Sequence, residues 1–155
     1  MLEHVPRRRL QRIAAIVAAA GLAGSRGPAR RAADRDYLEA YFRGVDAEDL
    51  RERDPRTLAL AALAHRESGL RRRRDEALVQ VFNPDPAVHG FDAAATYVAV
   101  VTDDMPFLVD SLGMAFSRRG IAIRLLVHPV LDVTRDARGR LTATALAAAD
   151  EPSAT

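Results

Sequence analysis

The residues best suited to chemistry in this 155-residue chain form a short acidic turn with the sequence D-D-M-P-F. An apolar strand is predicted before the turn, and an amphipathic helix after it. Because backbone N–H groups at the start of a helix attract carboxylates, the turn is a candidate amino-acid-binding site. Its residues are Asp103, Asp104, Met105, Pro106 and Phe107. The alternative is structural, since a capping residue followed by a proline also shapes the entry to a helix.

The other polar residues offer little support for catalysis or metal binding. Asp103 and Asp104 are adjacent and therefore diverge, and no third oxygen ligand follows at a known spacing. Asp110 and Ser111 would need a histidine partner to form a nucleophilic site. No two histidines stand at a metal-ligand spacing. We expect structural roles for all four of them, His4, His65, His89 and His128. We therefore expect no catalytic residue and no metal in this segment.

Composition excludes several further kinds of chemistry. The chain has no lysine and no cysteine, so it cannot form a Schiff base, a P-loop lysine site, a disulfide or a thiolate nucleophile. The absence of cysteine suits a cytoplasmic protein. With a net charge of only +2, the chain is not a polycation. It contains no run of about 18 apolar residues, so no membrane partner is expected.

Arg71 to Arg74 form a basic run that would suit an anionic partner such as nucleic acid. The competing interpretation is a solvated helix end, because arginines complement the dipole at a helix C-terminus. No aromatic side chains for base stacking lie nearby, and acidic residues balance the charge elsewhere. The sequence favours the solvated end, and we expect no nucleic-acid partner.

The first half of the chain, residues 1–74, is predicted to be helical. The first helix covers Pro6–Ala20. Its arginines and alanines also resemble a short signal peptide or a twin-arginine leader, but apolar residues at helical spacing favour an amphipathic helix packed on the domain. Two more helices are predicted, over Ala32–Arg43 and from the start signal Asp54–Pro55 to about Arg72.

The second half, residues 75–147, is predicted to hold a sheet. Its elements in order are strands at Ala77–Phe82 and Thr96–Thr102, a helix at Met105–Arg119, and strands at Ile121–Val133 and Leu141–Leu146. The second strand, the helix and the third strand would form a parallel crossover, with Gly113 allowing the helix close to the sheet. Gly120 suits a left-handed helix end. The predicted fold is α+β: N-terminal helices, then an incomplete ferredoxin-like β-α-β-β sheet and an unstructured tail at 148–155.

The segment V-T-D-D-M-P-F-L-V-D-S, followed by R-R-G-I-A-I, resembles the ACT regulatory module. With V-F-N-P before it and H-P-V-L after it, the chain is similar to the N-terminal region of the large NAD-specific glutamate dehydrogenases, over about Tyr37 to Leu141. The incomplete sheet would then be of the ACT type. The ACT turn usually has glycine at the position of Phe107. A bulky side chain there is expected to fill the pocket, which favours interface packing over ligand binding.

The resemblance implies that the parent enzyme oxidatively deaminates L-glutamate to 2-oxoglutarate and ammonia with NAD. In that family the NAD-binding and catalytic domains lie downstream, so this segment would be a non-catalytic regulatory or assembly segment that binds no cofactor. Its partners would be those downstream domains and further copies in a homo-oligomer. No G-x-G-x-x-G motif follows a strand here, which agrees with a non-catalytic role. The alternative is a free-standing ACT-type module that senses an amino acid.

Overall fold

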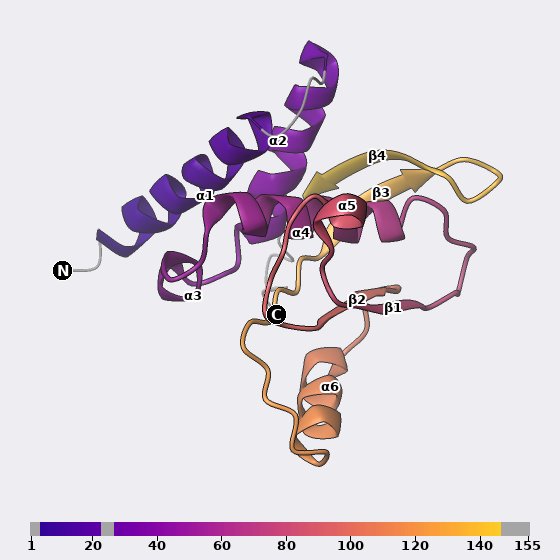
Figure 1. Cartoon of the computed structure of the whole chain (residues 1–155). Helices are drawn as coiled ribbons and strands as arrows, with labels where there is room; N and C mark the ends of the chain where they lie inside the picture. Colours follow the sequence, from indigo (N-terminus) through magenta and orange to yellow (C-terminus); the bar gives the residue numbers. More distant parts are fainter. Residues whose placement is uncertain (1–3, 23–26, 147–155) are drawn as a thin grey trace, which may run out of the picture.

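The computed structural model describes residues 4–22 and 27–146, in which a helical half is followed by two small antiparallel sheets (Figure 1). The helices are α1 His4–Leu22, α2 Pro28–Phe42, α3 Ala47–Arg51, α4 Pro55–Ser68, α5 Pro86–His89 and α6 Leu108–Ser117. The strands are β1 Leu78–Phe82, β2 Tyr97–Val101, β3 Leu131–Arg135 and β4 Leu141–Leu146. This arrangement confirms the predicted α+β class with an incomplete ACT-like fold. The tail predicted at 148–155 lies outside the described residues.

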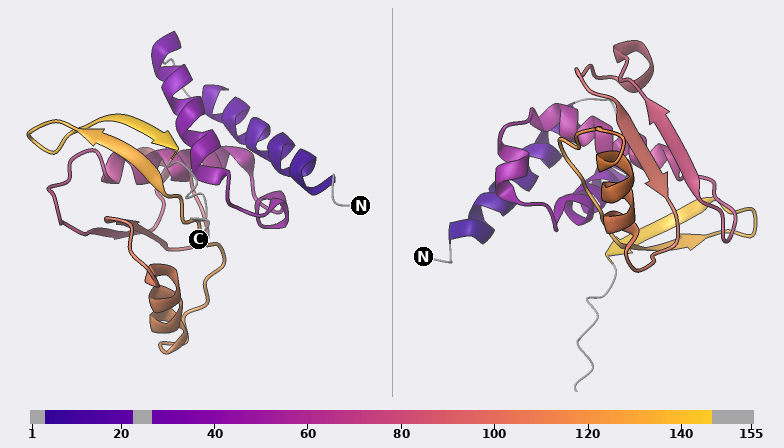
Figure 2. Two further views of the ribbon diagram at one scale, coloured as in Figure 1. Left: turned by 180° about the vertical axis from the view of Figure 1, so that it is seen from behind. Right: turned by 90° about the horizontal axis from the view of Figure 1, so that it is seen from below.

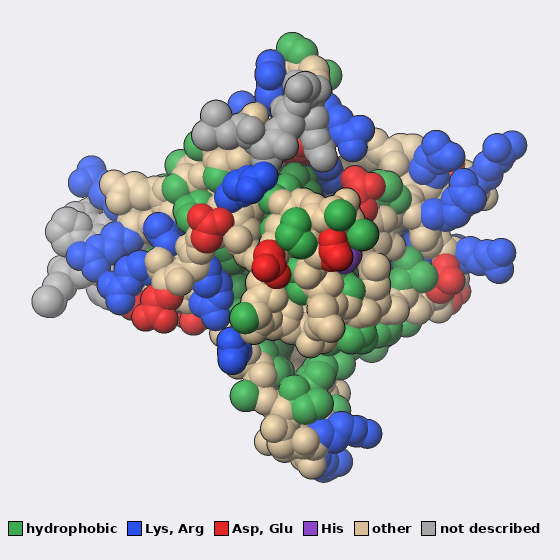
Figure 3. All heavy atoms as spheres, viewed as in Figure 1, with side chains coloured by type: hydrophobic (Ala, Val, Ile, Leu, Met, Phe, Trp, Pro, Cys, Tyr) green, Lys and Arg blue, Asp and Glu red, His purple; other side chains and the backbone are tan. Residues whose placement is uncertain are grey.

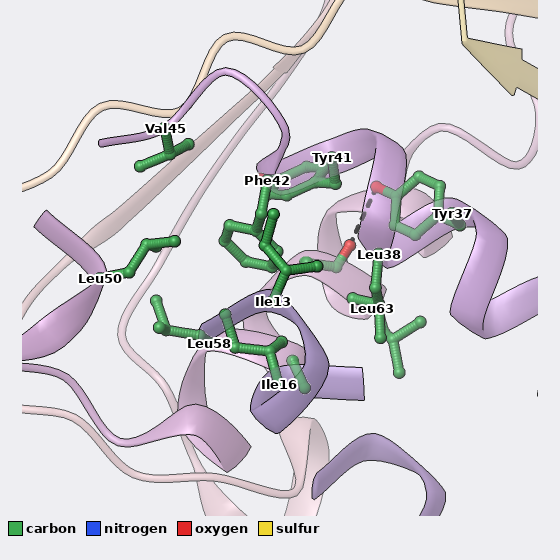
Figure 4. Packing of buried hydrophobic residues seen from close by; sticks show 12 residues of the cluster. Ile13, Ile16, Tyr37, Leu38, Tyr41, Phe42, Val45, Leu50, Leu58 and Leu63 are labelled. Carbon is green, nitrogen blue, oxygen red and sulfur yellow. Dashed lines mark hydrogen bonds between the residues drawn. The ribbon is translucent and has the colours of Figure 1, made fainter. Parts of the chain in front are cut away.

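The hydrophobic core lies among the first four helices (Figure 4). α1 contributes Ile13 and Ile16 to it, which confirms the prediction of an amphipathic helix packed on the domain. The buried cluster consists of Ile13, Ile16, Tyr37, Leu38, Tyr41, Phe42, Val45, Leu50, Leu58, Ala59, Ala62 and Leu63. Burial of each large apolar side chain contributes about 1.5–3 kcal/mol. Most of the buried hydrophobic side chains are therefore in the helical half.

Two of these helices begin with proline at the first helical position, where the missing N–H costs nothing. α4 starts at Pro55 as predicted, and the Asp54 carboxylate accepts a hydrogen bond from the Thr57 backbone N–H at 2.8 Å. That bond is the main reason that the pKa of Asp54 is lowered. α2 starts at Pro28, before the predicted Ala32, because the proline opens the helix instead of closing the loop.

The end of α4 differs from the prediction. The helix ends at Ser68 and not near Arg72, and the chain continues as an irregular linker over residues 69–77. Arg71 in this linker forms a β-bridge with Arg140 of the β3–β4 hairpin. The basic run is therefore not a solvated helix end as predicted, and one of its members, Arg72, is buried. The linker takes this path because pairing with the hairpin supplies the hydrogen bonds that a longer helix would have made.

The two sheets are separate local pairs (Figures 1 and 2). β1 and β2 are antiparallel, with Leu78 opposite Val101, and β3 and β4 form an antiparallel hairpin. The predicted parallel crossover is wrong, since residues 121–130 form no strand. Pro129 has no N–H to give to a ladder, and α6 buries none of its residues against a sheet. Nothing within 4 Å would meet a side-chain carbon at Gly113, so the expected close approach is absent as well.

Candidate functional site

The candidate turn lies between β2 and α6, where the chain leaves the small sheet and projects from the body of the molecule (Figure 1). α6 begins at Leu108, three residues after the predicted start. The N-cap residue is Phe107, which has φ 61° and ψ 12° and makes no side-chain capping bond. Pro106 therefore precedes the cap and does not occupy the first helical position. The expected arrangement of an acidic cap followed by proline is not formed.

Asp103 is held by an arginine from the linker. Its Oδ1 accepts a hydrogen bond from Arg72 Nη2 at 2.7 Å, and Arg72 Nε donates to the Glu76 carbonyl oxygen at 2.6 Å. The Arg72 side chain is buried, whereas that of Asp103 is more than half exposed. This contact ties the start of the turn to the linker. Sequence reasoning missed Arg72, because within a run of four arginines nothing marks one of them as buried.

The rest of the turn faces outward. Asp104, Met105, Pro106 and Phe107 are all exposed, and the Phe107 side chain is 76% exposed. The expectation that a bulky residue here fills a pocket is therefore wrong, because most of the Phe107 side chain is exposed. The turn thus contains one carboxylate held in place, that of Asp103, and four exposed residues. It lies next to the first N–H groups of α6, which have no acceptors within the helix.

The end of α6 follows the prediction. Gly120 has φ 67°, and its N–H donates to the Ser117 carbonyl at 3.0 Å. The Ile121 N–H donates to the Phe116 carbonyl at 3.0 Å. These two bonds form the Schellman pattern that a left-handed glycine closes. α6 is thus a well-defined helix at its C-terminal end.

α6 carries apolar side chains around most of its circumference, yet no residue of the helix is buried. We define the α6 surface as the exposed apolar side chains on this helix and its flanks. They are Met105, Phe107, Met114, Ile121 and Ile123. The apolar residues along one face of the helix are half-buried; they are Leu108, Leu112, Ala115 and Phe116. A group of exposed apolar side chains on one helix and its flanks is typical of a region that contacts another protein surface.

A buried polar network connects the helices to β2. His65 Nε2 lies 3.0 Å from the Val100 carbonyl, and Nδ1 lies 2.8 Å from the Tyr41 hydroxyl. Since a carbonyl can only accept, Nε2 carries the proton and Nδ1 accepts from Tyr41. Burial lowers the pKa of His65 and raises the pKa values of Tyr37 and Tyr41. The geometry gives His65 the structural role that was expected of it.

The described residues hold no group of three or more His, Asp or Glu side chains that could bind a metal ion. None of the helices in this part of the chain is both long and apolar enough to cross a membrane. Two hollows open on the helical side, one of about 330 Å³ between α1 and α2 and one of about 570 Å³ between α2, α4 and β4. The residues of the turn line neither of them.

Comparison with known proteins matches residues 37–155 to the family described as "Glutamate dehydrogenase, ACT1 domain". The chain is 37% identical over 105 residues to an NAD-specific glutamate dehydrogenase of Pseudomonas aeruginosa, a match that covers 68% of the chain and 6% of that protein. It is 35% identical over 112 residues to an NAD-specific glutamate dehydrogenase of Halomonas elongata, which covers 72% of the chain and 7% of that protein. The chain thus spans a small fraction of these relatives. No solved structure matches it significantly.

Proposed function

Because the chain belongs to the glutamate dehydrogenase ACT1-domain family, we propose that it is an N-terminal regulatory or assembly segment of an NAD-specific glutamate dehydrogenase. The parent polypeptide would oxidatively deaminate L-glutamate to 2-oxoglutarate and ammonia with NAD in the cytoplasm. Residues 1–74 would act as a helical support and residues 75–147 as an ACT-like domain. The segment itself would be non-catalytic, since it has no lysine and no strand-linked glycine motif for NAD.

The observation that carries this proposal is the uncovered α6 surface. Met114 on α6 is 54% exposed and the N-cap residue Phe107 is 76% exposed, and the helix itself buries no residue. When another surface covers such a group of exposed apolar side chains, the free energy of the system falls. The relatives that match this chain are more than ten times longer than the matched part. We assign the covering surface to the downstream domains of the same polypeptide, within a homo-oligomer.

The test is a charge placed on the α6 surface of the full-length parent enzyme. Met114→Glu is expected to weaken docking of this segment by roughly 2 kcal/mol or more, because the covered site would then bury a charge. Val88→Glu on α5 is the matched control, since Val88 is 76% exposed and lies outside the α6 surface. Oligomer mass and thermal unfolding are measured for both variants. Equal behaviour of the two variants would contradict docking through α6.

Amino-acid sensing at the turn is the second candidate function. It is favoured by one observation: the turn residues from Asp104 to Phe107 are exposed beside the free N–H groups at the start of α6. The engagement of Asp103 by Arg72 counts against it, because that carboxylate is already paired. Calorimetric titration of the chain with the common amino acids separates the two functions. Saturable binding that Phe107→Trp abolishes would favour the sensor.

A further inference from the structure

The groove between α2, α4 and the β3–β4 hairpin has a volume of about 570 Å³ and an excess of positive charge. Four arginines and two carboxylates line it, which leaves two positive charges unbalanced. The charged lining residues are Arg30, Asp34, Arg66, Glu67, Arg71 and Arg140. The apolar part of the groove wall is formed by Ala33, Leu70 and Leu141. Figure 3 shows further basic side chains gathered towards the hairpin tip and the adjacent linker.

Both carboxylates of the groove are already engaged by two of its arginines. Asp34 Oδ1 lies 2.5 Å from Arg66 Nη2, and both side chains are nearly buried. Glu67 Oε1 lies 3.8 Å from Arg30 Nη2 in an exposed pair. The positive charges of Arg71 and Arg140 are therefore not balanced within the groove.

Arg71 and Arg140 face each other directly. The Arg72 N–H donates to the Gly139 carbonyl at 3.0 Å, and the Leu141 N–H donates to the Leu70 carbonyl at 2.8 Å. These two bonds flank the bridge, so Arg71 and Arg140 occupy a non-hydrogen-bonded position, where side chains of opposite strands are closest. Like charges directly opposite each other are destabilising. Two exposed arginines on opposite strands at such a position can together bind an anion with two charges, and we call this pair the arginine clamp.

The carboxylate of Asp136 on the hairpin is engaged by backbone N–H groups. Asp136 Oδ1 accepts hydrogen bonds from the backbone N–H groups of Arg138 and Arg140, both at 2.9 Å. These bonds and the neighbouring arginines lower the pKa of Asp136. Its carboxylate is thus used to close the hairpin turn, and it offsets the local positive charge only in part.

We propose that this groove is a binding site for a small dianion, a phosphorylated compound or a dicarboxylate, held by Arg71 and Arg140. The volume is within the range of sites that hold small molecules, and the apolar wall of Leu70 and Leu141 would contact a short carbon chain. The site goes beyond the proposed function and does not depend on it, because it shares no residue with the α6 surface.

The test uses pyrophosphate and succinate as probes at constant ionic strength, titrated into the 155-residue chain by calorimetry. Saturable one-to-one binding of at least one probe is expected. The double variant R71Q/R140Q should weaken that binding about tenfold or more, since it removes two charge-assisted donors. The matched control R74Q/R138Q removes one arginine from the linker and one from the hairpin, but neither residue lines the groove. It should change the affinity less than about twofold.

Stability gives a second readout that does not require a tight ligand. Without an anion, R71Q/R140Q should unfold at a higher temperature than the unmodified chain, because the opposed charges are gone. The better-binding probe should raise the unfolding temperature of the unmodified chain and of R74Q/R138Q, but not of R71Q/R140Q. Absence of binding by both probes would overturn the proposal. Equal weakening of probe binding in both double variants would also overturn the proposal. So would salt-sensitive binding of duplex DNA that both variants lose equally, since either result indicates a diffuse basic surface.

Discussion

At the scale of single residues, Phe107 stands where the backbone is left-handed, with φ 61°. This conformation costs about 1–2 kcal/mol for a residue with a Cβ and little for glycine. Replacing Phe107 by glycine or by alanine removes the same exposed ring, so the two variants differ mainly in this backbone cost. We expect Phe107→Gly to be more stable than Phe107→Ala by roughly 1 kcal/mol in urea unfolding. An alanine variant of equal or greater stability would show that the positive φ is not maintained.

His65 gives the chain a pH-dependent stability. Burial lowers its pKa in the folded chain below the value of about 6.5 that it has when unfolded. At pH values between these two pKa values the unfolded chain binds more protons, so the free energy of unfolding falls as the pH drops below about 6.5. The contribution is fully present above that pH and is lost as the pH falls through the folded pKa.

The variant His65→Gln tests this dependence. A glutamine amide can donate to the Val100 carbonyl and accept from Tyr41, but it does not titrate. We expect the free energy of unfolding of this variant to vary less between about pH 5 and pH 7 than that of the unmodified chain. His128→Gln is the control, because His128 is exposed. If both variants keep the pH profile of the unmodified chain, His65 does not contribute to it.

At the scale of elements, two strong local signals predicted helix boundaries correctly, whereas the start of α2, the end of α4 and the start of α6 differ from the prediction. The start of α4 at Asp54–Pro55 and the left-handed end of α6 at Gly120 are both correct, because each depends on hydrogen bonds within a few residues. The first strand of the predicted crossover is found as β2, but the strand after the helix could not be placed from sequence alone. The alternation from Ile121 to Val133 is a real pattern, but pairing depends on a partner distant in sequence and on burial of α6, and neither is encoded in that segment.

The candidate site shows the same division between local and distant information. The sequence located the turn from Asp103 to Phe107 between a strand and a helix, which is correct. It could not reveal that Arg72, 31 residues earlier, holds Asp103, since an ion pair between distant residues leaves no mark in either local pattern. The opposed pair Arg71 and Arg140 was hidden for the same reason, because the bridge joins two segments 69 residues apart.

At the scale of the whole molecule, burial is uneven. The cluster of buried residues belongs to the helical half, and the only buried apolar side chains of the described residues after α4 are those of Pro84, Phe91 and Ala99. Local opening is least costly where few apolar contacts are broken. The helical half is therefore the more stable part of the molecule, and α6 has lower local stability. A partner surface that covers α6 would stabilise this helix more than it would stabilise the buried helices.

This difference predicts a gradient in amide hydrogen exchange. The amides of α4 around Leu58–Leu63 lie in the core and should exchange only when the chain unfolds globally, whereas amides in α6 around Leu112–Ser117 should open locally and exchange roughly tenfold faster or more. Mass spectrometry of peptic fragments measures both in one sample. In the full-length parent enzyme, the α6 amides should become as protected as those of α4, because a covering surface must separate before they open. Equal protection of α4 and α6 in the 155-residue chain would mean that α6 is already packed, and the case for docking through its surface would fail.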